Sequence, residues 1–290
     1  MTEETWTPLR LINWTKGFLA SKGIQSPRLE AERLLSAALG CERIDLYARY
    51  DETVPTPTLA LFREMVRRRA AREPTQYILG QTEFRGHLFK TDRRALIPRP
   101  ESEIIVELAL EAAGDAPELL LADIGTGSGC LAVTAALALP QAKVVACDIS
   151  AEALSLAHEN AEHHRVLERI EFHCGDFAAV LAGFAGRVDV AMANPPYVRE
   201  EEVPSLAPEL REHEPHVALV AGPDGTEFIS RVLAFAPTLL APGGHLVMEM
   251  GFGQGDRVRT MVAERPTLEL VRMEKDFDGI ERVALIAKIS

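Results

Sequence analysis

The sequence predicts an α/β protein: a doubly wound, mostly parallel sheet of seven strands, with a small N-terminal helical bundle and a β-hairpin connector. Short apolar and β-branched segments alternate with helical segments from residue 119 onward, as in sheets covered on both faces. A glycine-rich turn follows the first of these strands, and residues 5–72 show helical periodicity. We therefore expect three parts: a helical bundle at 1–73, a connector at 74–97 and an α/β domain at 98–290.

Composition restricts the class of protein before any motif is considered. The 290 residues are 47% hydrophobic and 26% charged, which is typical of a folded globular chain. The longest apolar stretch, residues 131–139, is far shorter than the roughly 20 residues of a membrane span. The acidic N-terminus lacks the layout of a signal peptide, so we expect a cytoplasmic protein without membrane contact.

Charge and cysteine spacing exclude further classes. A formal net charge of −12 argues against stable binding to duplex DNA, which is a polyanion. The four cysteines show no C-x-x-C pairing, so we expect reduced structural thiols and no metal site.

The helical bundle is expected to contain three helices. One spans residues 9–19. A second is expected to be capped by Ser26, to begin at Pro27 and to end at Gly40, and a third to be capped by Thr56 and to begin at Pro57. The third helix carries a basic face, which either is solvated or contacts an acidic partner protein or RNA. Its members are Arg63, Arg67, Arg68, Arg69 and Arg72. We expect the bundle to dock the substrate.

The connector and the first helix of the α/β domain follow. Residues 77–96 alternate apolar and polar side chains around Gly80 and Gly86, as in a β-hairpin. The stretch from Pro98 to Glu103 then begins a helix that ends near Gly114. Carboxylates suit a helix N-terminus, which explains Glu101 structurally, whereas Arg99 has no such explanation.

The remaining elements complete the alternating pattern. Strands are expected at residues 119–124, 143–147, 170–173, 188–193 and 245–250, and two terminal strands, 268–273 and 282–289, form an antiparallel edge. Helices are expected at residues 130–139, 151–164, 227–240 and 256–264.

Three consecutive strand ends carry residues suited to a nucleoside. The turn Gly125-Thr126-Gly127-Ser128-Gly129 allows backbone N–H groups to approach a ligand, and its spacing is not the G-x-G-x-x-G of dinucleotide binders. Asp148 ends the next strand and is placed to accept hydrogen bonds from a ribose diol. Asp176 and Phe177 end the third, offering a carboxylate for an adenine amine and an aromatic wall.

Asn194-Pro195-Pro196-Tyr197 follows the fourth strand and is the candidate reaction site. Proline cannot continue a strand, so the chain leaves the sheet at Asn194. The Asn194 side-chain oxygen and the Pro195 carbonyl can together accept both hydrogens of an –NH₂ group, and Tyr197 offers a stacking face. An ordinary Asn-Pro turn with a packed tyrosine is the alternative.

These motifs resemble those of class I S-adenosylmethionine-dependent methyltransferases, a Rossmann-like fold, that act on amide or exocyclic amine nitrogen. Nearly the whole chain resembles the HemK family of release factor glutamine methyltransferases. The resemblance lies in Pro74-x-Gln76-Tyr77-Ile78-x-Gly80, Phe84, Gly86, Phe89, Leu96-Ile97-Pro98-Arg99-Pro100-Glu101-Ser102-Glu103, Glu214-Pro215-x-x-Ala218-Leu219, Gly222-x-Asp224-Gly225 and Glu249-x-Gly251-x-x-Gln254. Ser102 stands where the family usually has threonine, and Phe177 where tryptophan is frequent.

The resemblance implies a substrate, a cofactor and roles for residues. The substrate would be the side-chain nitrogen, N5, of the glutamine in the Gly-Gly-Gln motif of peptide chain release factors, and S-adenosyl-L-methionine would donate the methyl group. The tetrapeptide would contact both, so Asn194 counts among cofactor and substrate residues. Arg99 and Glu101 are further candidate substrate contacts.

Three alternatives remain at this stage. A DNA adenine or cytosine amino-methyltransferase would use the same tetrapeptide on a flipped base, but the net charge opposes it. A ribosomal-protein glutamine methyltransferase is related, although residues 99–103 match the release factor branch better. A nucleoside-sensing scaffold without activity would not need Asn194. His213 and His216 receive no role.

Overall fold

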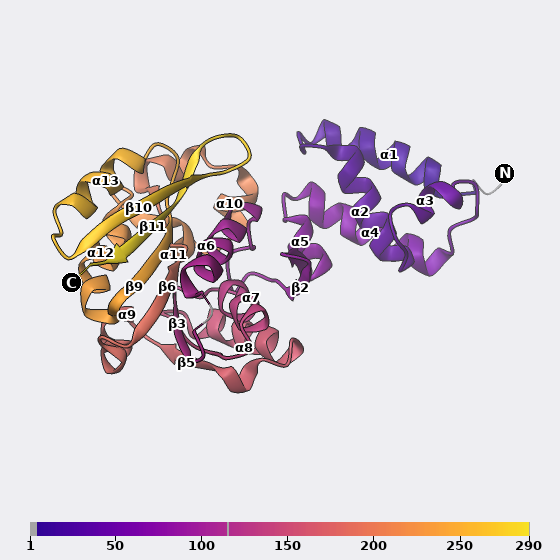
Figure 1. Ribbon diagram of the computed structural model, residues 1–290. Coiled ribbons are helices and arrows are strands. Elements are labelled where there is room, and N and C mark those ends of the chain that lie inside the picture. Colours follow the sequence, from indigo (N-terminus) through magenta and orange to yellow (C-terminus); the bar gives the residue numbers. More distant parts are fainter. Residues whose placement is uncertain (1–4, 115, 290) are drawn as a thin grey trace. The chain divides into compact units, whose positions relative to one another are not determined.

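The computed structural model describes residues 5–114 and 116–289, and the chain divides into two compact units (Figure 1). The first unit comprises Met1–Gly80 together with Ala207–His213, and the second comprises Gln81–Leu206 and Glu214–Ser290. No helix among the described residues has the length and apolar character needed to cross a membrane. All four cysteines carry free thiols.

The first unit is helical. Its elements are α1 (Pro8–Ser21), α2 (Pro27–Leu39), α3 (Asp45–Ala48), α4 (Thr56–Ala70), α5 (Thr75–Leu79) and, from the distant segment, α10 (Pro208–His213). Proline stands in the first turn of α1, α2 and α4, where its missing N–H costs nothing. The core is made of apolar side chains that α1, α2 and α4 turn inward, including Leu11, Leu19, Leu34, Leu35, Phe62 and Val66.

Three local predictions for this unit are wrong. The Ser26 side chain makes no capping hydrogen bond, because its backbone is left-handed with φ 47°. Thr56 lies inside α4, whose N-cap is Pro55. Tyr77 was expected in a strand but lies in α5, where it is buried. Glycine at position 80 adopts φ 72°, which ends this short helix and delays the first strand to residue 81.

The arginines of α4 are largely neutralised by carboxylates. Arg69 is only 6% exposed, and its guanidinium lies 2.6 Å from Glu30 and 3.0 Å from Glu209. Because Glu209 belongs to α10, this cluster attaches α10 to the helical unit. Ion pairs on this face also join Arg67 to Glu64, Arg68 to Glu73, and Arg72 to Glu209. The predicted basic face is therefore mostly an ion-pair network.

The second unit begins with the predicted hairpin. Strands β1 (Gln81–Phe84) and β2 (His87–Lys90) pair antiparallel around Arg85 and Gly86, which both have positive φ. Two such residues form the tight turn that suits the twist of a hairpin. A 3₁₀ turn, η1 (Pro100–Ser102), then leads into α6 (Glu103–Ala113).

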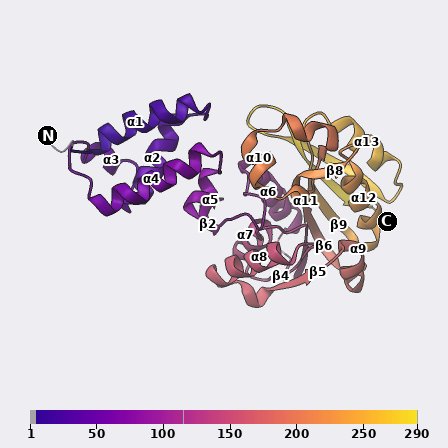
Figure 2. The ribbon, with the colours of Figure 1, turned by 180° about the vertical axis from the view of Figure 1, so that it is seen from behind.

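The predicted seven-stranded, mostly parallel sheet is confirmed. Its strands are β3 (Leu119–Ile124), β4 (Ala142–Asp148), β5 (Ile170–Cys174), β6 (Val188–Ala193), β9 (Leu240–Glu249), β10 (Leu268–Lys275) and β11 (Glu281–Lys288). Their order is β10-β11-β9-β6-β3-β4-β5. Figure 2 labels β9, β6, β4 and β5 among them. Strand β11 runs antiparallel to both β9 and β10, so only β10 of the antiparallel pair is an edge strand. A small parallel pair, β7 (Val198–Arg199) and β8 (Val220–Gly222), follows β6 in the chain.

Helices cover both faces of the sheet. On one face, α6, α7 (Cys130–Ala138) and α8 (Ala151–His163) pack on the inward side chains of the strands. On the other, α9 (Phe177–Val180), α12 (Glu227–Leu239) and α13 (Gly255–Ala263) do the same, and the short α11 (His216–Leu219) precedes β8. Strand order reverses between β3 and β6, and such a switch point opens a crevice at the carboxyl ends of the strands.

Candidate active site

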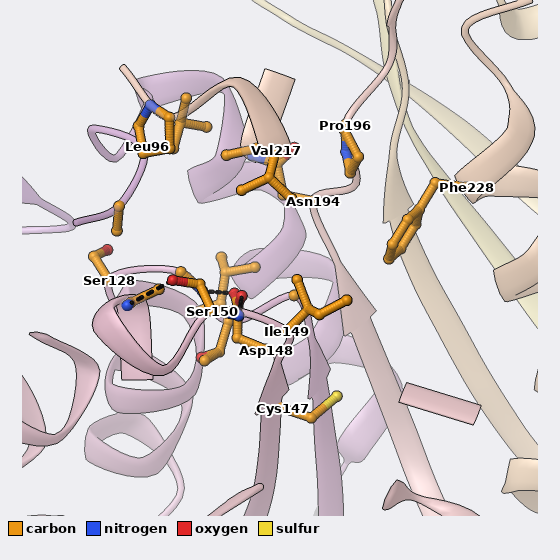
Figure 3. Close-up of a pocket in the computed structure, with 18 of the residues that line it drawn as sticks. Leu96, Ser128, Cys147, Asp148, Ile149, Ser150, Asn194, Pro196, Val217 and Phe228 are labelled. Atoms are coloured by element: carbon orange, nitrogen blue, oxygen red, sulfur yellow. Dashed lines mark hydrogen bonds between the residues drawn. The ribbon is translucent and has the colours of Figure 1, made fainter. Parts of the chain in front are cut away.

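A cavity of about 320 Å³ lies in the second unit, at the carboxyl ends of β3, β4, β5 and β6 (Figure 3). This volume falls at the lower end of the range typical of small-molecule sites. Most residues predicted for the site line it: Arg99, Gly125, Thr126, Gly127, Ser128, Asp148, Asp176, Phe177, Asn194 and Pro196. Four predicted residues lie outside its lining: Glu101, Gly129, Pro195 and Tyr197.

The glycine turn after β3 is bound to the neighbouring strand. The backbone N–H groups of Gly125 and Thr126 both donate to the Cys147 carbonyl at 2.9 Å, and that of Gly127 donates to Asp148 Oδ2 at 2.9 Å. These N–H groups are directed to β4, so the expectation that they face a ligand is wrong for these three residues. What the glycines supply is a left-handed backbone, with φ 55° at Gly127.

Gly129 lies outside the lining of the cavity and has a role in packing. Its φ is 80°, and a Cβ at this position would lie 2.9 Å from the Ala157 Cβ in α8. The start of α7 can therefore approach α8 only because residue 129 has no side chain.

Asp148 presents a carboxylate that is already oriented. Its Oδ1 accepts a hydrogen bond from the Ser150 N–H and its Oδ2 accepts from the Gly127 N–H, both at 2.9 Å. Each oxygen keeps a second lone-pair direction, so the carboxylate can also accept from a diol. Its place at the end of β4 among the lining residues is the one predicted for it.

A second carboxyl group, that of Asp123, is hydrogen-bonded to the glycine turn. Asp123, the residue before Ile124 in β3, is fully buried and accepts from Thr126 Oγ1 at 2.6 Å and from the Ala132 N–H at 3.1 Å. Burial raises the pKa of Asp123 to about 7, although these hydrogen bonds oppose the shift. The carboxyl thus ties the turn to the start of α7.

Asp176 and Phe177 are arranged differently from the prediction. Asp176 pairs with Arg231 of α12, and this hydrogen bond lowers the pKa of the Asp176 carboxyl. Phe177 is only 4% exposed; its ring packs on Phe228 at 5.3 Å between centroids and under the Arg231 guanidinium at 4.9 Å. Phe228 itself faces the cavity (Figure 3). Sequence reasoning missed Phe228 and Arg231, because they lie about fifty residues further along the chain.

Two exposed aliphatic side chains also line the cavity. Ile149 is 65% exposed and Val217 is 56% exposed. Apolar surface left open inside a concavity indicates a ligand with an apolar face. An apolar residue directly after Asp148 was a signal available in the sequence.

Asn194 directly follows β6, and its side-chain amide is hydrogen-bonded to Ser102. Its Nδ2 donates to Ser102 Oγ at 2.8 Å, so the amide nitrogen is engaged and Oδ1 is directed away from Ser102. Pro196 joins it in the lining (Figure 3), whereas Pro195 is buried. The Tyr197 hydroxyl donates to Glu249 Oε1 at 3.4 Å, and burial raises the pKa of this phenol. Tyr197 is therefore hydrogen-bonded to Glu249 and does not line the cavity as a stacking face.

Arg99 is held by a buried carboxylate. Its guanidinium pairs with Glu214, a buried residue that also accepts from the Ile97 N–H at 3.3 Å. This contact joins the segment before η1 to the segment before α11, and Arg99 remains among the lining residues. Glu101 is not one of them. No group of three or more His, Cys, Asp or Glu suited to a metal occurs in the part of the chain that is described.

The chemistry of these residues fits a nucleoside. Asp148 supplies anionic acceptors for hydroxyl groups, while Ile149, Val217 and Phe228 supply apolar walls for a planar ring. Asn194 lines the same cavity and brings a polar amide to it.

Two known protein domains match separate parts of this chain. Residues 10–80 match the PrmC N-terminal domain, and residues 104–215 match the methyltransferase small domain. The chain is 43% identical to the release factor glutamine methyltransferase of Geobacter sulfurreducens over 285 residues, 98% of each chain. It is 40% identical to the enzyme of that name from Chlorobaculum tepidum, over 97% of each chain.

Among solved structures, the hMettl16 catalytic domain in complex with MAT2A 3'UTR hairpin 6 superposes with a TM-score of 0.55 at 15% identity. The match covers 70% of this chain and 75% of that one, and at this identity it shows the shared fold alone. The two relatives, in contrast, extend through both units of the chain at identities of 40% or more. The resemblance drawn from the motifs is confirmed: this chain belongs to the release factor glutamine methyltransferase family.

Proposed function

We propose that this protein methylates the side-chain amide nitrogen, N5, of the glutamine in the Gly-Gly-Gln motif of peptide chain release factors. S-adenosyl-L-methionine would be the methyl donor, held by the Gly125–Gly129 turn, Asp148 and the apolar walls of the cavity. The proposal rests on family membership and on the chemistry of the lining.

One observation carries the proposal: the polarity of the Asn194 amide. Because Nδ2 donates to Ser102, the group left to meet a substrate is the acceptor Oδ1. An acceptor is what an incoming –NH₂ group requires. The Pro195 carbonyl, next in the chain, is the proposed second acceptor, so that both hydrogens of one amide would be bound.

Such acceptors address the difficult step of the reaction. An amide nitrogen is a weak nucleophile, because its lone pair is delocalised into the carbonyl. Acceptors placed for the rehybridised nitrogen bind it more strongly in the transition state than in the ground state, which lowers the barrier. The bound donor supplies a sulfonium methyl group that is electrophilic without further activation. The protein's contribution is thus to orient the amide and to exclude water.

The alternatives lose support at specific residues. Nucleic acid binding would need cations without carboxylate partners, whereas Arg67, Arg68, Arg69 and Arg72 each form an ion pair with a glutamate. The net charge of −12 also opposes binding to duplex DNA, because DNA is a polyanion. A silent scaffold would have no use for an oriented amide at Asn194.

The test is a methyl transfer assay with labelled donor. Purified protein would be incubated separately with release factor, with a release factor carrying alanine for the Gly-Gly-Gln glutamine, with ribosomal protein and with duplex DNA. We expect label only in the unmodified release factor, and peptide mass spectrometry should locate it on that glutamine. Label in DNA or in ribosomal protein, or none in release factor, would refute the proposal.

A further inference from the structure

A buried carboxyl group, that of Glu249, is linked to Asn194 by hydrogen bonds through Ser102. The methyl transfer chemistry proposed above assigns it no role. Glu249 is the last residue of β9 and is 2% exposed. Ser102 Oγ donates to its Oε2 at 2.6 Å, and the Tyr197 hydroxyl donates to its Oε1 at 3.4 Å. Both residues also connect Glu249 to the tetrapeptide: Ser102 accepts from Asn194, and Tyr197 is its last residue. Glu249 is thus connected to Asn194 through one hydroxyl.

The direction of these hydrogen bonds follows from counting donors. A serine hydroxyl has one hydrogen and two lone pairs. When that hydrogen points to the Glu249 carboxylate, the oxygen of Ser102 can only accept from Asn194. Asn194 must then turn its –NH₂ group toward Ser102, as the 2.8 Å contact from Nδ2 shows, and its Oδ1 away from Ser102.

The reverse arrangement becomes available if Glu249 carries a proton. A carboxylic O–H on Oε2 would donate to Ser102, whose own hydrogen would then point to Asn194. Asn194 would satisfy this donor with Oδ1 and would present its –NH₂ group to the substrate. Two –NH₂ groups facing each other are both donors, so the substrate amide would lose its acceptor.

We propose that Glu249 is a positioning residue for methyl transfer: as a carboxylate it holds Asn194, through Ser102, with the amide oxygen toward the substrate amide. The inference rests on the proposed function and deepens it. A residue 55 positions beyond Asn194 would set the donor or acceptor character of the group that meets the nucleophile.

The surroundings of Glu249 place its ionisation near neutral pH. Burial is the largest influence and raises the pKa of Glu249 to about 7, and the nearby charge of Glu101 acts in the same direction. The hydrogen bonds from Ser102 and Tyr197 and the charge of Arg282, on β11, oppose the shift. The carboxylate, and with it the productive amide orientation, therefore predominates above about pH 7 and is lost as pH falls through that value.

A double-mutant cycle tests whether Glu249 acts through Asn194. In Glu249→Gln the neutral amide can either donate to Ser102 or accept from it, so both hydrogen-bond directions become populated. We expect single-turnover transfer to fall about tenfold, with nearly unchanged affinities for donor and release factor. In an Asn194→Ala background the same substitution should cause little further loss. If the tenfold loss persists in that background, Glu249 does not act through Asn194.

The pH profile and the serine provide matched controls. Wild-type single-turnover rates should rise with one ionisation near pH 7, and Glu249→Gln should lack that step. Ser102→Thr keeps the hydroxyl and should retain the step, whereas Ser102→Ala should lose it and resemble Glu249→Gln. An unchanged step in Glu249→Gln would overturn the assignment.

A spectroscopic readout separates this inference from the proposed substrate. The chain has only three asparagines, Asn13, Asn160 and Asn194. Selective ¹⁵N labelling of asparagine side chains therefore gives three –NH₂ signals, and Asn194→Ala identifies one of them. In wild type this signal should shift between pH 5 and 9, and in Ser102→Ala it should not. A wild-type signal that stays fixed would refute the relay, whether or not release factor is methylated.

Discussion

At the residue scale, the site is made of side chains whose hydrogen-bonding direction is fixed by neighbours. Asp148 is oriented by two backbone N–H groups, and Asn194 by Ser102. Such groups lose little conformational freedom when a ligand binds, which improves affinity and rate.

Asp148→Ala should weaken binding of S-adenosylmethionine. The substitution removes charged acceptors, and hydrogen bonds to a charged group are typically worth about 1.5–3 kcal/mol. That corresponds to a dissociation constant higher by roughly 10- to 150-fold. Isothermal titration calorimetry with the donor is the measurement, after circular dichroism has shown that the variant is folded.

Asp176→Asn serves as the comparison for this prediction. Its carboxylate already pairs with Arg231, so we expect a smaller loss of affinity than for Asp148→Ala. An equal loss of donor affinity in the two variants would show that pairing with Arg231 does not reduce the contribution of Asp176 to donor binding.

At the element scale, the junction between the glycine turn, α7 and α8 depends on one missing side chain. Gly129→Ala would place a Cβ 2.9 Å from Ala157 on a backbone with φ 80°, which an alanine adopts with strain. We expect the free energy of unfolding of the second unit to fall by about 1–3 kcal/mol. Urea denaturation followed by circular dichroism measures it.

Gly183→Ala is the matched control for that substitution. Gly183 has an ordinary φ, and an added Cβ would meet nothing within 4 Å. We expect its unfolding free energy to change by less than about 0.5 kcal/mol. A loss as large as that of Gly129→Ala would mean that close packing on α8 is not the cause.

Helix α2 gives the first unit a pH-dependent contact. Glu32 accepts hydrogen bonds from Tyr47, Arg43 and Arg28. Burial raises the pKa of Glu32, but these three hydrogen bonds together outweigh it and lower the pKa from 4.5 to about 2. A depressed carboxyl pKa stabilises the fold above the ordinary value, and this stability is lost as pH falls toward the folded-state value.

Glu32→Gln should therefore be less stable than wild type at pH 6, and the difference should shrink as pH falls below 4.5. Both tryptophans of the chain, Trp6 and Trp14, lie in the first unit, so their fluorescence reports on its unfolding alone. Urea titrations at several pH values provide the data. A difference that stays constant down to pH 3 would contradict the linkage.

Prediction from sequence found residues of the cavity where a local pattern marks the end of a strand. The turn at residues 125–129, Asp148 and Asn194 each follow a strand, and a strand end can be identified from local pattern. The Ser102–Glu249 contact joins residues 147 positions apart, and Phe228 reaches the cavity from a different helix. Contacts of this kind depend on how helices and strands pack together, and the hydrophobic periodicity of a sequence does not reveal that packing. Tyr77 illustrates the same limit, because burial in the helical unit decides its structure.

At the scale of the whole molecule, the chain alternates between its two units. It leaves the helical unit after Gly80, returns to it for Ala207–His213, and leaves it again. The returning segment contributes Glu209 to the cluster around Arg69 and Arg72. We propose that the helical unit docks the release factor, because residues 10–80, which form most of it, match a separate N-terminal domain and not the methyltransferase domain.

A fragment of residues 81–290 tests this division. The second unit has its own two cores, so we expect the fragment to fold and to bind S-adenosylmethionine with an affinity close to that of the full chain. Methylation of release factor should fall sharply. Trypsin should cut the fragment faster at Arg211, because α10 has lost its helical partners. A fragment that methylates release factor at the full rate would exclude a docking role.

The interrupted first unit has a consequence for how such a protein can be recombined. An exchange of residues 1–80 between two relatives would separate Arg69 and Arg72 from their carboxylate partner, since Glu209 would remain with the other parent. A chimera that transfers the module intact must carry residues 207–213 along with it. Inheritance of the helical part is therefore linked to a seven-residue segment encoded more than 120 codons downstream.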